Sequence, residues 1–247
     1  MAGPESNAVV AQRVDVASGL MILRVMPKGW DLPPFKAGQY TVLGLPGRAQ
    51  RAPLTDEEPP PTDPDKLIRR AYSIASSSVE NEYLEFYVTL VRSGALTPRL
   101  FALGPGDPLW LSSKFVGMFT LDRVPSGQNI LLVATGTGIA PYMSMLRSHL
   151  QEIRGPRVAV VHGARHSWDL GYRAELSTMQ RLVPAFSYVP VVSSPGEETV
   201  PWKGRTGFIN DLWQDGSLKE AMGFEPSPAD THVFLCGNPL MIEGMMG

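Results

Sequence analysis

The sequence is poor in the residue types that build metal centres. Its 247 residues include one cysteine, Cys236, and four histidines that lack the spacing of metal ligands. A single thiol forms no internal disulfide, and it supplies neither a multi-cysteine zinc site nor an iron–sulfur cluster. These absences argue against a metalloenzyme, and we expect no bound metal.

Charge of one sign and long apolar runs are also scarce. The net charge is −2, from 22 basic and 24 acidic residues, which gives no electrostatic case for nucleic-acid binding. No stretch approaches the ~18 apolar residues of a membrane span. The start MAGPESNAVV has neither the basic beginning nor the apolar run of a signal peptide. We therefore expect a cytoplasmic protein that binds neither nucleic acid nor membrane.

The first half of the chain has the pattern of short β-strands. With 43% hydrophobic residues, the chain can bury a real core, and its length suits one large domain or two ordinary ones. Glycine and proline punctuate the runs, and a helical period is almost absent, so we expect an antiparallel barrel or sandwich. The expected strands are residues 9–16, 20–25, 40–45, 70–75 and 83–91.

The strand pattern stops between Pro46 and Pro64. This segment contains six prolines and several acidic residues, so it is not a core element. We interpret it as an exposed, flexible insertion, with a lid over a bound ligand as the alternative.

The second half alternates between buried strands and helices. Such alternation favours a parallel sheet with right-handed crossovers. The boundary falls near Val124–Gly127, which gives domains of residues 1–124 and 125–247. The expected strands are 129–134, 157–162, 186–192 and 232–236, with helices at 141–153, 169–182 and from 208 onward.

A glycine-rich turn, Gly136-Thr137-Gly138-Ile139-Ala140-Pro141, joins a buried strand to a helix. Glycine lets the backbone approach a ligand closely, and the free N–H groups at a helix start favour an anionic diphosphate. This context predicts a nucleotide site. The alternative is a tight turn that only packs the helix onto the sheet.

Two segments of the first half suit a flat, phosphorylated ligand. Arg70-Ala71-Tyr72-Ser73 places a cation and a ring on one face of a strand, although a cross-strand pair on a solvated face would look the same. In Gly94–Leu100, Thr97 fits a helix N-cap and Pro98 the first helical position. An ordinary capped helix is the alternative there.

These segments occur in a characteristic order, and Cys236-Gly237-Asn238-Pro239 completes it near the C-terminus. The arrangement resembles the ferredoxin–NADP reductase family of flavoenzymes, especially its bacterial branch. Residues 35–40 and 117–122 are also similar to that family. The resemblance implies an antiparallel β-barrel domain that binds FAD, followed by a parallel α/β domain that binds NADP.

The resemblance also implies roles for single residues. Tyr72 would stack on the isoalloxazine ring, Ser73 would lie near flavin N5, and Cys236 near the nicotinamide. Arg70 would pair with the FAD diphosphate. A lone thiol that ends an apolar strand is otherwise a small buried hydrophobe. The remaining FAD contacts would come from Val88, Leu90, Gly94, Leu96 and Thr97. The remaining NADP contacts would come from Gly136, Thr137, Gly138, Pro141, Gly237 and Asn238.

The preference for NADP over NAD has a physical basis of its own. NAD enzymes often hold the ribose 2′-hydroxyl with a carboxylate after the second strand, whereas a basic residue favours a 2′-phosphate. Here the strand at 157–162 is followed by Arg165, with no acid between. Arg165 is our first candidate for the 2′-phosphate and Arg173 the second, with Tyr172 facing the adenine.

We therefore expect a monomeric enzyme that exchanges a hydride between NADPH and FAD, and single electrons with ferredoxin or flavodoxin. Such partners are acidic, so a basic patch is expected. The chain ends at Gly247, within what should be the last helix of the family, so its C-terminal tail is expected to be missing. The alternatives are an oxygenase reductase served by a separate ferredoxin, and a flavin- or nucleotide-binding regulatory subunit. The candidates for the basic patch are Arg48, Arg51, Lys66, Arg69 and Arg99.

Overall fold

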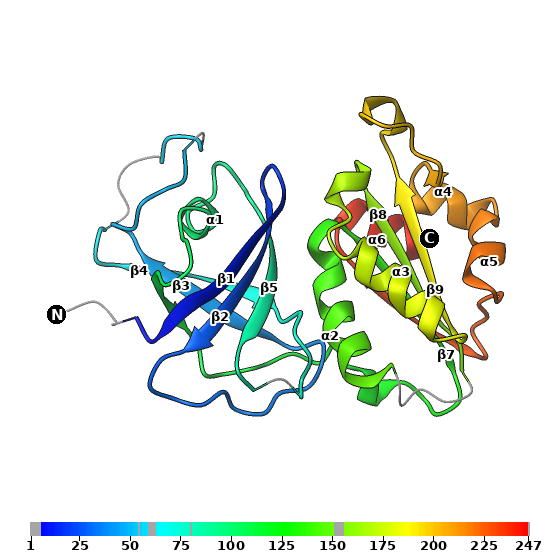
Figure 1. The fold of residues 1–247 in the computed structure, drawn as a ribbon. Helices are drawn as coiled ribbons and strands as arrows, with labels where there is room; N and C mark the ends of the chain where they lie inside the picture. The colour runs from blue at the N-terminus through cyan, green and yellow to red at the C-terminus, as the bar shows by residue number, and fades with distance from the viewer. Residues whose placement is uncertain (1–5, 54, 59–62, 80, 151–155, 247) are drawn as a thin grey trace. The chain divides into compact units, whose positions relative to one another are not determined.

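The computed structural model describes residues 6–53, 55–58, 63–79, 81–150 and 156–246. The chain divides into two compact units, which differ in their sheets (Figure 1). The first unit, the β-unit, comprises Met1–Leu121 together with Ala140–Ser148. The second, the α/β-unit, comprises Asp122–Ile139 and His149–Gly247.

The β-unit contains a barrel-like, six-stranded antiparallel sheet, which confirms the predicted fold class. The strand order is β4-β3-β6-β1-β2-β5, and every pairing in it is antiparallel. The sequence did not reveal β6, which is short and pairs with two strands distant in sequence. The strands are β1 (Ala8–Ala17), β2 (Leu20–Pro27), β3 (Tyr40–Pro46), β4 (Leu67–Ser73), β5 (Leu84–Thr89) and β6 (Pro108–Leu111).

Apolar side chains from all six strands fill the interior of the β-unit. Leu23, Leu43, Phe86 and Leu111 are completely buried in one cluster. Alternating burial along β2 follows from the two-residue period of a strand. The single-turn helix α1 (Thr97–Leu100) adds Leu100 to the same cluster.

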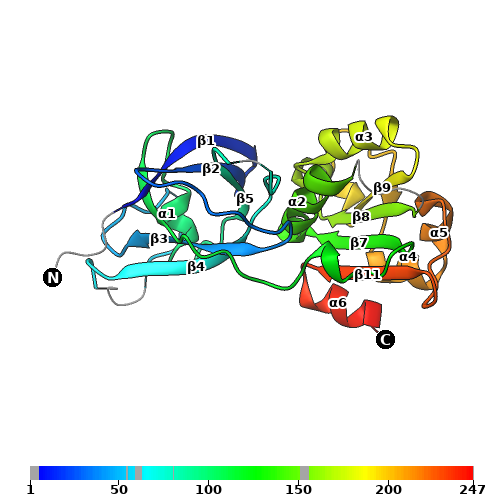
Figure 2. The same cartoon turned by 90° about the horizontal axis from the view of Figure 1, so that it is seen from below.

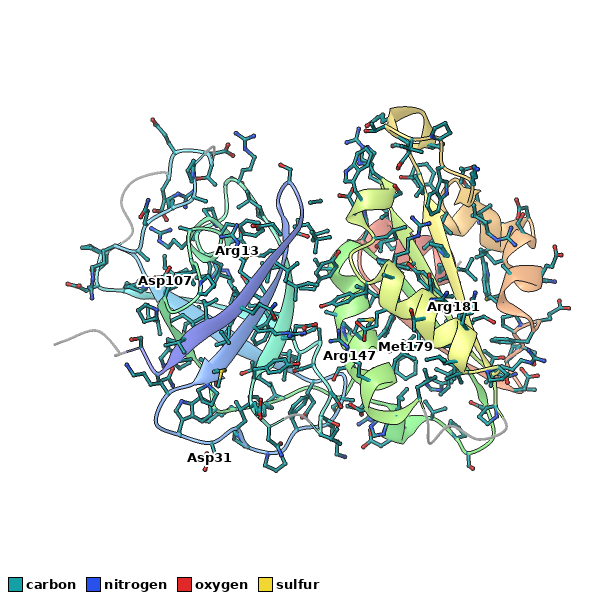
Figure 3. The ribbon with its side chains drawn as sticks, in the orientation of Figure 1. Arg13, Asp31, Asp107, Arg147, Met179 and Arg181 are labelled. Atoms are coloured by element: carbon teal, nitrogen blue, oxygen red, sulfur yellow. The ribbon has the colours of Figure 1, made fainter. Side chains whose placement is uncertain are left out.

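Helix α2 (Ala140–His149) belongs to the β-unit up to Ser148. Arg147, labelled in Figure 3, donates hydrogen bonds from α2 to the carbonyl oxygen of Ala75 (2.8 Å) and to Oε1 of Glu85 (2.7 Å). The Glu85 side chain is 1% exposed, and its other oxygen accepts a hydrogen bond from Nε of Arg24. Two cations therefore neutralise this buried carboxylate, as burial of a charge requires.

The α/β-unit contains a five-stranded parallel sheet in the order β10-β9-β8-β7-β11, as the alternating pattern predicted. The strand predicted at 186–192 has those bounds in the structure, whereas the two-residue β10 was not predicted. The strands are β7 (Asn129–Thr135), β8 (Val158–Ala164), β9 (Phe186–Val192), β10 (Arg205–Thr206) and β11 (Thr231–Cys236).

Helices cover both faces of this parallel sheet (Figures 1 and 2). Helix α3 lies on one face and α6 on the other. Residues of α4, α5 and α6 share one apolar cluster with β7, β8 and β9. The helices are α3 (Arg173–Leu182), α4 (Ile209–Gln214), α5 (Ser217–Met222) and α6 (Pro239–Met246). The 3₁₀-helices are η1 (Leu121–Arg123), η2 (Gly136–Ile139), η3 (Ser167–Asp169) and η4 (Pro195–Glu197).

The starts of two helices differ from the predicted ones: α3 begins later than residue 169, whereas α2 begins one residue before 141. The helix expected from residue 169 is interrupted, because Leu170 has ψ of 66° after η3, and α3 begins only at Arg173. The glycine turn first forms η2, so α2 begins at Ala140; residues 151–153 of that predicted helix lie outside the described residues. None of the helices in the described residues has the length and apolar character needed to cross a bilayer.

Candidate nucleotide-binding sites

A pocket of about 360 Å³ lies along β4 in the β-unit. Half of its lining residues are cations, which favours a phosphorylated ligand. Because β4 is at the end of the strand order, the pocket borders a sheet edge. The lining residues are Lys66, Leu67, Ile68, Arg69, Arg70 and Ala95.

The predicted Arg70–Ser73 segment forms the C-terminal half of β4. Arg70 is exposed, and its Nη1 donates a hydrogen bond to the carbonyl oxygen of Arg69 (2.8 Å). Tyr72 is half-buried and packs edge-to-face on Phe86, with ring centroids 6.4 Å apart. Burial raises the pKa of Tyr72 to about 12, although nearby Arg70 opposes this shift. The ring therefore stays neutral at physiological pH, and a neutral aromatic ring is suited to stacking.

The turn before α1 is closed by Thr97, but not in the predicted way. Thr97 is the first helical residue rather than the N-cap; the cap is Leu96, which makes no side-chain capping bond. The Thr97 hydroxyl donates to the carbonyl oxygen of Val91 (3.1 Å) and accepts from the Val91 N–H (3.0 Å). The N–H of Gly94 donates to the same carbonyl (2.8 Å). The hydroxyl thus fixes the shape of the turn, and the prediction of a cap was wrong.

Three predicted FAD residues have side chains that point into the protein. Val88 and Leu96 are each 1% exposed, and both belong to the apolar core. Leu90 packs against that core, and its N–H donates to the carbonyl oxygen of Gly19 (2.8 Å). Contacts of these residues with a ligand are therefore contacts of the backbone.

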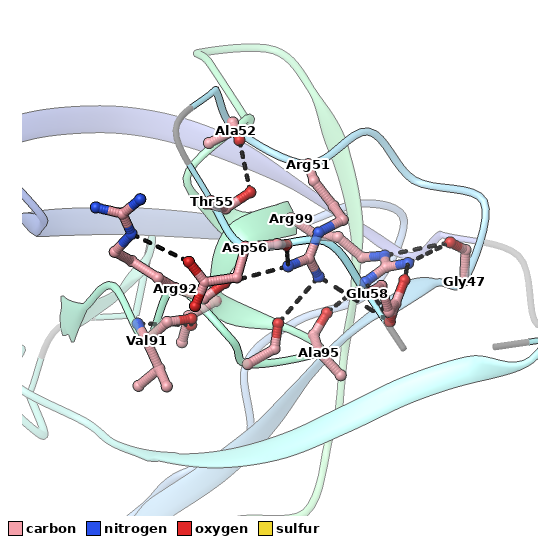
Figure 4. A network of polar contacts seen from close by, with 12 residues as sticks. Gly47, Arg51, Ala52, Thr55, Asp56, Glu58, Val91, Arg92, Ala95 and Arg99 are labelled. Atoms are coloured by element: carbon pink, nitrogen blue, oxygen red, sulfur yellow. Dashed lines mark hydrogen bonds and ion pairs between the residues drawn. The ribbon is translucent and has the colours of Figure 1, made fainter. Parts of the chain in front are cut away.

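Arg51, Glu58 and Arg99 form a polar clasp that holds the proline-rich segment against α1 (Figure 4). Arg99 binds both carboxylate oxygens of Glu58 (2.7 and 3.1 Å) and the carbonyl oxygens of Gly47 and Ala95. Arg51 donates to the carbonyl oxygen of Gly94 (3.0 Å). The described part of this segment therefore makes hydrogen bonds to α1 and to the turn before it. Arg99 is 2% exposed, so its prediction as part of a surface patch was wrong.

In the α/β-unit, the two glycines of the predicted nucleotide turn have different surroundings. Gly136 has φ of +53°, and no atom lies within 4 Å of the position that a Cβ would occupy. A Cβ on Gly138 would lie 2.3 Å from the carbonyl oxygen of Cys236. Gly136 thus leaves space for a ligand, whereas Gly138 allows η2 to pack on the end of β11. The packing alternative applies to Gly138, and the nucleotide site stays a prediction.

The Cys236-Gly237-Asn238 segment lies beside this turn, although about a hundred residues separate them. The N–H of Asn238 donates to Oγ1 of Thr135 (2.7 Å), and a Cβ on Gly237 would lie 2.2 Å from the same oxygen. Thr135 directly precedes Gly136. Burial raises the pKa of the Cys236 thiol. Cys236 is therefore protonated at neutral pH, which does not suit a nucleophile.

Arg165 follows β8 at the carboxyl edge of the sheet, as predicted, but it faces a carboxylate from another loop. Its Nη2 lies 3.0 and 3.1 Å from the two oxygens of Glu197. Arg173 lies over the ring of Trp202 at 4.6 Å. Tyr172 is 3% exposed, so the interpretation that it faces an adenine was wrong.

Two groups at this edge escaped the sequence analysis. Glu197 is 32 residues from Arg165, so no local motif could reveal the pair. Trp168 stacks on the His166 ring, with centroids 4.4 Å apart, and remains 41% exposed. Within the part of the chain that the structure describes, no three His, Cys, Asp or Glu residues gather as a metal site would require.

Comparison with known proteins identifies a family for this chain. Residues 132–246 match the model of the oxidoreductase NAD-binding domain. The flavodoxin/ferredoxin–NADP reductase of Shigella flexneri is 36% identical over 85% of this chain and 77% of its own. The ferredoxin–NADP reductase of Pseudomonas aeruginosa is 33% identical over 85% and 76%.

Solved structures share the fold. A ferredoxin–NADP⁺ reductase from Neisseria gonorrhoeae, with bound FAD and NADP, matches with a TM-score of 0.80 and 23% identity over 98% of this chain and 90% of its own. A cytochrome P450 reductase from Amycolatopsis matches with a TM-score of 0.74 and 27% identity, over 98% and 65%.

Proposed function

The chain belongs to the ferredoxin–NADP reductase family, and we propose that it exchanges a hydride between NADPH and an FAD held by the β-unit, and single electrons with ferredoxin or flavodoxin. The proposal rests on one observation. Each unit has a site that suits a bound anion, and beside it a residue that could contact a flat ring. In the β-unit these are the basic pocket and Tyr72. In the α/β-unit they are the open Gly136 turn and Cys236.

The residues of the β-unit fit a flavin nucleotide. When bound, FAD accepts a hydride and releases electrons one at a time. Arg70 would pair with its diphosphate, Tyr72 would offer a neutral ring for stacking, and Ser73 would lie beside the reactive edge. The backbone of Val88 and Leu90 would meet the pyrimidine edge. The turn formed by Gly94, Leu96 and Thr97 would hold the diphosphate.

The residues of the α/β-unit fit a pyridine nucleotide. Gly136, Thr137 and Gly138 of this unit would line the diphosphate and the nicotinamide, as would Pro141 of α2. Cys236, Gly237 and Asn238 would orient the nicotinamide ring, and orientation matters because a misplacement of ~1 Å can cost about 10²-fold in rate. Arg165 and Arg173 would bind the 2′-phosphate.

The functional domains that we propose are residues 1–124 for FAD and 125–247 for NADP. We propose a monomer in the cytoplasm, where its acidic electron partners would also be found. Arg48, Lys66 and Arg69 are the exposed cations that would support such docking. The reductase names of the relatives favour this function over a regulatory subunit or an oxygenase reductase.

The proposal is tested on the purified protein by flavin absorption and by turnover of NADPH with an artificial one-electron acceptor. We expect a yellow protein that releases FAD when it is unfolded. Arg70→Ala should weaken FAD binding at least tenfold, about the worth of one charge-assisted hydrogen bond. The control is Arg48→Ala, which removes an exposed cation paired with Asp65. Absence of turnover would favour the flavin- or nucleotide-binding regulatory subunit instead.

A further inference from the structure

The loops that follow β8 and β9 lie side by side at the carboxyl edge of the parallel sheet. The N–H groups of Ser193 and Ser194 donate to the carbonyl oxygens of Ala164 and Arg165, each at 3.0 Å. Ligands of open α/β sheets bind at this edge. The backbone ladder therefore brings acidic residues of the second loop to the cation that would bind the coenzyme.

The two neighbouring glutamates of that second loop have different tasks. Both oxygens of Glu198 accept hydrogen bonds from Ser167, one from its N–H and one from its hydroxyl, each at 2.6 Å. Glu198 thus fastens the two loops together. Glu197 instead binds Nη2 of Arg165 and lies 2.8 Å from Nε2 of His166.

The Arg165–Glu197 pair is open to solvent. The two side chains are 66% and 53% exposed, so a ligand can reach both. Their ion pair is weak, since water screens the attraction between exposed charges. A dianionic phosphate can therefore displace Glu197 from Arg165, but only against the repulsion of the displaced carboxylate.

We propose that Glu197 is a specificity-determining residue that narrows the preference for NADPH over NADH. It competes with the 2′-phosphate for Arg165, and it accepts a hydrogen bond from the 2′-hydroxyl when the phosphate is absent. The sequence rule that an arginine after the second strand selects NADP is thus opposed by a carboxylate from the next loop. This inference rests on the proposed function, in which Arg165 meets the ribose.

The test is calorimetric titration of the FAD-loaded protein with adenosine 2′,5′-bisphosphate and with 5′-AMP, which differ only in the 2′-phosphate. Glu197→Gln should tighten the bisphosphate about fivefold to tenfold, as expected for one nearby charge at low salt, and should leave 5′-AMP unchanged or weaker. The gain should shrink at high salt, because screening weakens a repulsion but does not alter a purely structural effect. The matched control is Glu220→Gln, an exposed carboxylate on α5, which should change neither affinity.

The outcomes separate this inference from the function on which it rests. The decisive quantity is the ratio of the affinity for the bisphosphate to the affinity for 5′-AMP. If this ratio in Glu197→Gln lies within twofold of the wild-type ratio, the inference is overturned. Arg165→Ala provides the second arm, because it should weaken the bisphosphate far more than 5′-AMP. If Arg165→Ala discriminates and Glu197→Gln does not, the role of Glu197 is wrong and the site of Arg165 stands. If Arg165→Ala weakens both probes equally, Arg165 does not bind the 2′-phosphate and both proposals for this edge fail.

Discussion

Neutralising Glu58 tests whether the polar clasp holds the proline-rich segment on the β-unit. The Arg99 side chain is 3% exposed, and its five N–H groups make five hydrogen bonds, two of them to Glu58. Removal of one partner from a buried ion pair costs ~3–5 kcal/mol. Glu58 is 20% exposed, and an amide would keep one acceptor, so for Glu58→Gln we expect a loss of about 2 kcal/mol.

A loss of that size lowers the melting temperature of a chain of this length by about 4–8 °C. The measurement is urea and thermal unfolding followed by circular dichroism. The control is Asp56→Asn in the same segment. Asp56 pairs with Arg92 at 3.4 Å, but both side chains are more than half exposed, so its loss should cost no more than about 0.5 kcal/mol. Equal losses of unfolding free energy in the two variants would show that burial of the Glu58–Arg99 pair adds no stability, which would refute the reasoning.

Three further substitutions test the α/β-unit. In urea unfolding, Gly138→Ala should destabilise the protein by ~2–3 kcal/mol, because the new Cβ would meet the backbone of Cys236. Gly136→Ala should cost only ~1 kcal/mol, because its positive φ is the only obstacle to a side chain. A larger loss for Gly136→Ala than for Gly138→Ala would contradict the packing role of Gly138. Burial lowers the pKa of His162 from 6.5 to about 4. The unfolded chain therefore binds a proton at His162 near pH 6.5, whereas the folded chain binds it only near pH 4. The free energy of unfolding consequently falls as the pH drops from 7 towards 4. Between pH 7 and pH 5 the loss should be about 2 kcal/mol, and His162→Asn should abolish that part of the acid sensitivity; an unchanged sensitivity would refute the assignment.

Strands that are buried on both faces were the easiest elements to predict. The run Phe186–Val192 is apolar except for Ser187, and the polar residues Ser193 and Ser194 follow it, so hydrophobicity indicated the strand. The four-residue β6 carries no such signal, because its place is set by pairing with β1 and β3, which are distant in sequence. Local pattern therefore predicted the two kinds of sheet but not every member.

The local sequence predicted the element on which several candidate site residues lie. Arg70 and Tyr72 lie on a strand, and Gly136 lies in a turn between a strand and a helix, as predicted. Thr97 shows where this fails. A threonine before a proline is typical of an N-cap, yet its hydroxyl finds both partners on Val91, six residues earlier. Competition between two local hydrogen-bonding modes is invisible in the pattern of residue types.

Arg165 shows a second limit, which concerns charge rather than conformation. Arg165 was predicted to favour NADP because no acidic residue lies between the strand and Arg165 in the sequence. In a parallel sheet, however, the loops that meet at the carboxyl edge follow neighbouring strands, and β9 is the neighbour of β8. The charge that Arg165 experiences is consequently set by Glu197, which comes after β9. A coenzyme preference in such a fold should therefore be inferred from adjacent loops together, because one carboxylate from the next loop can offset the cation that the first loop supplies.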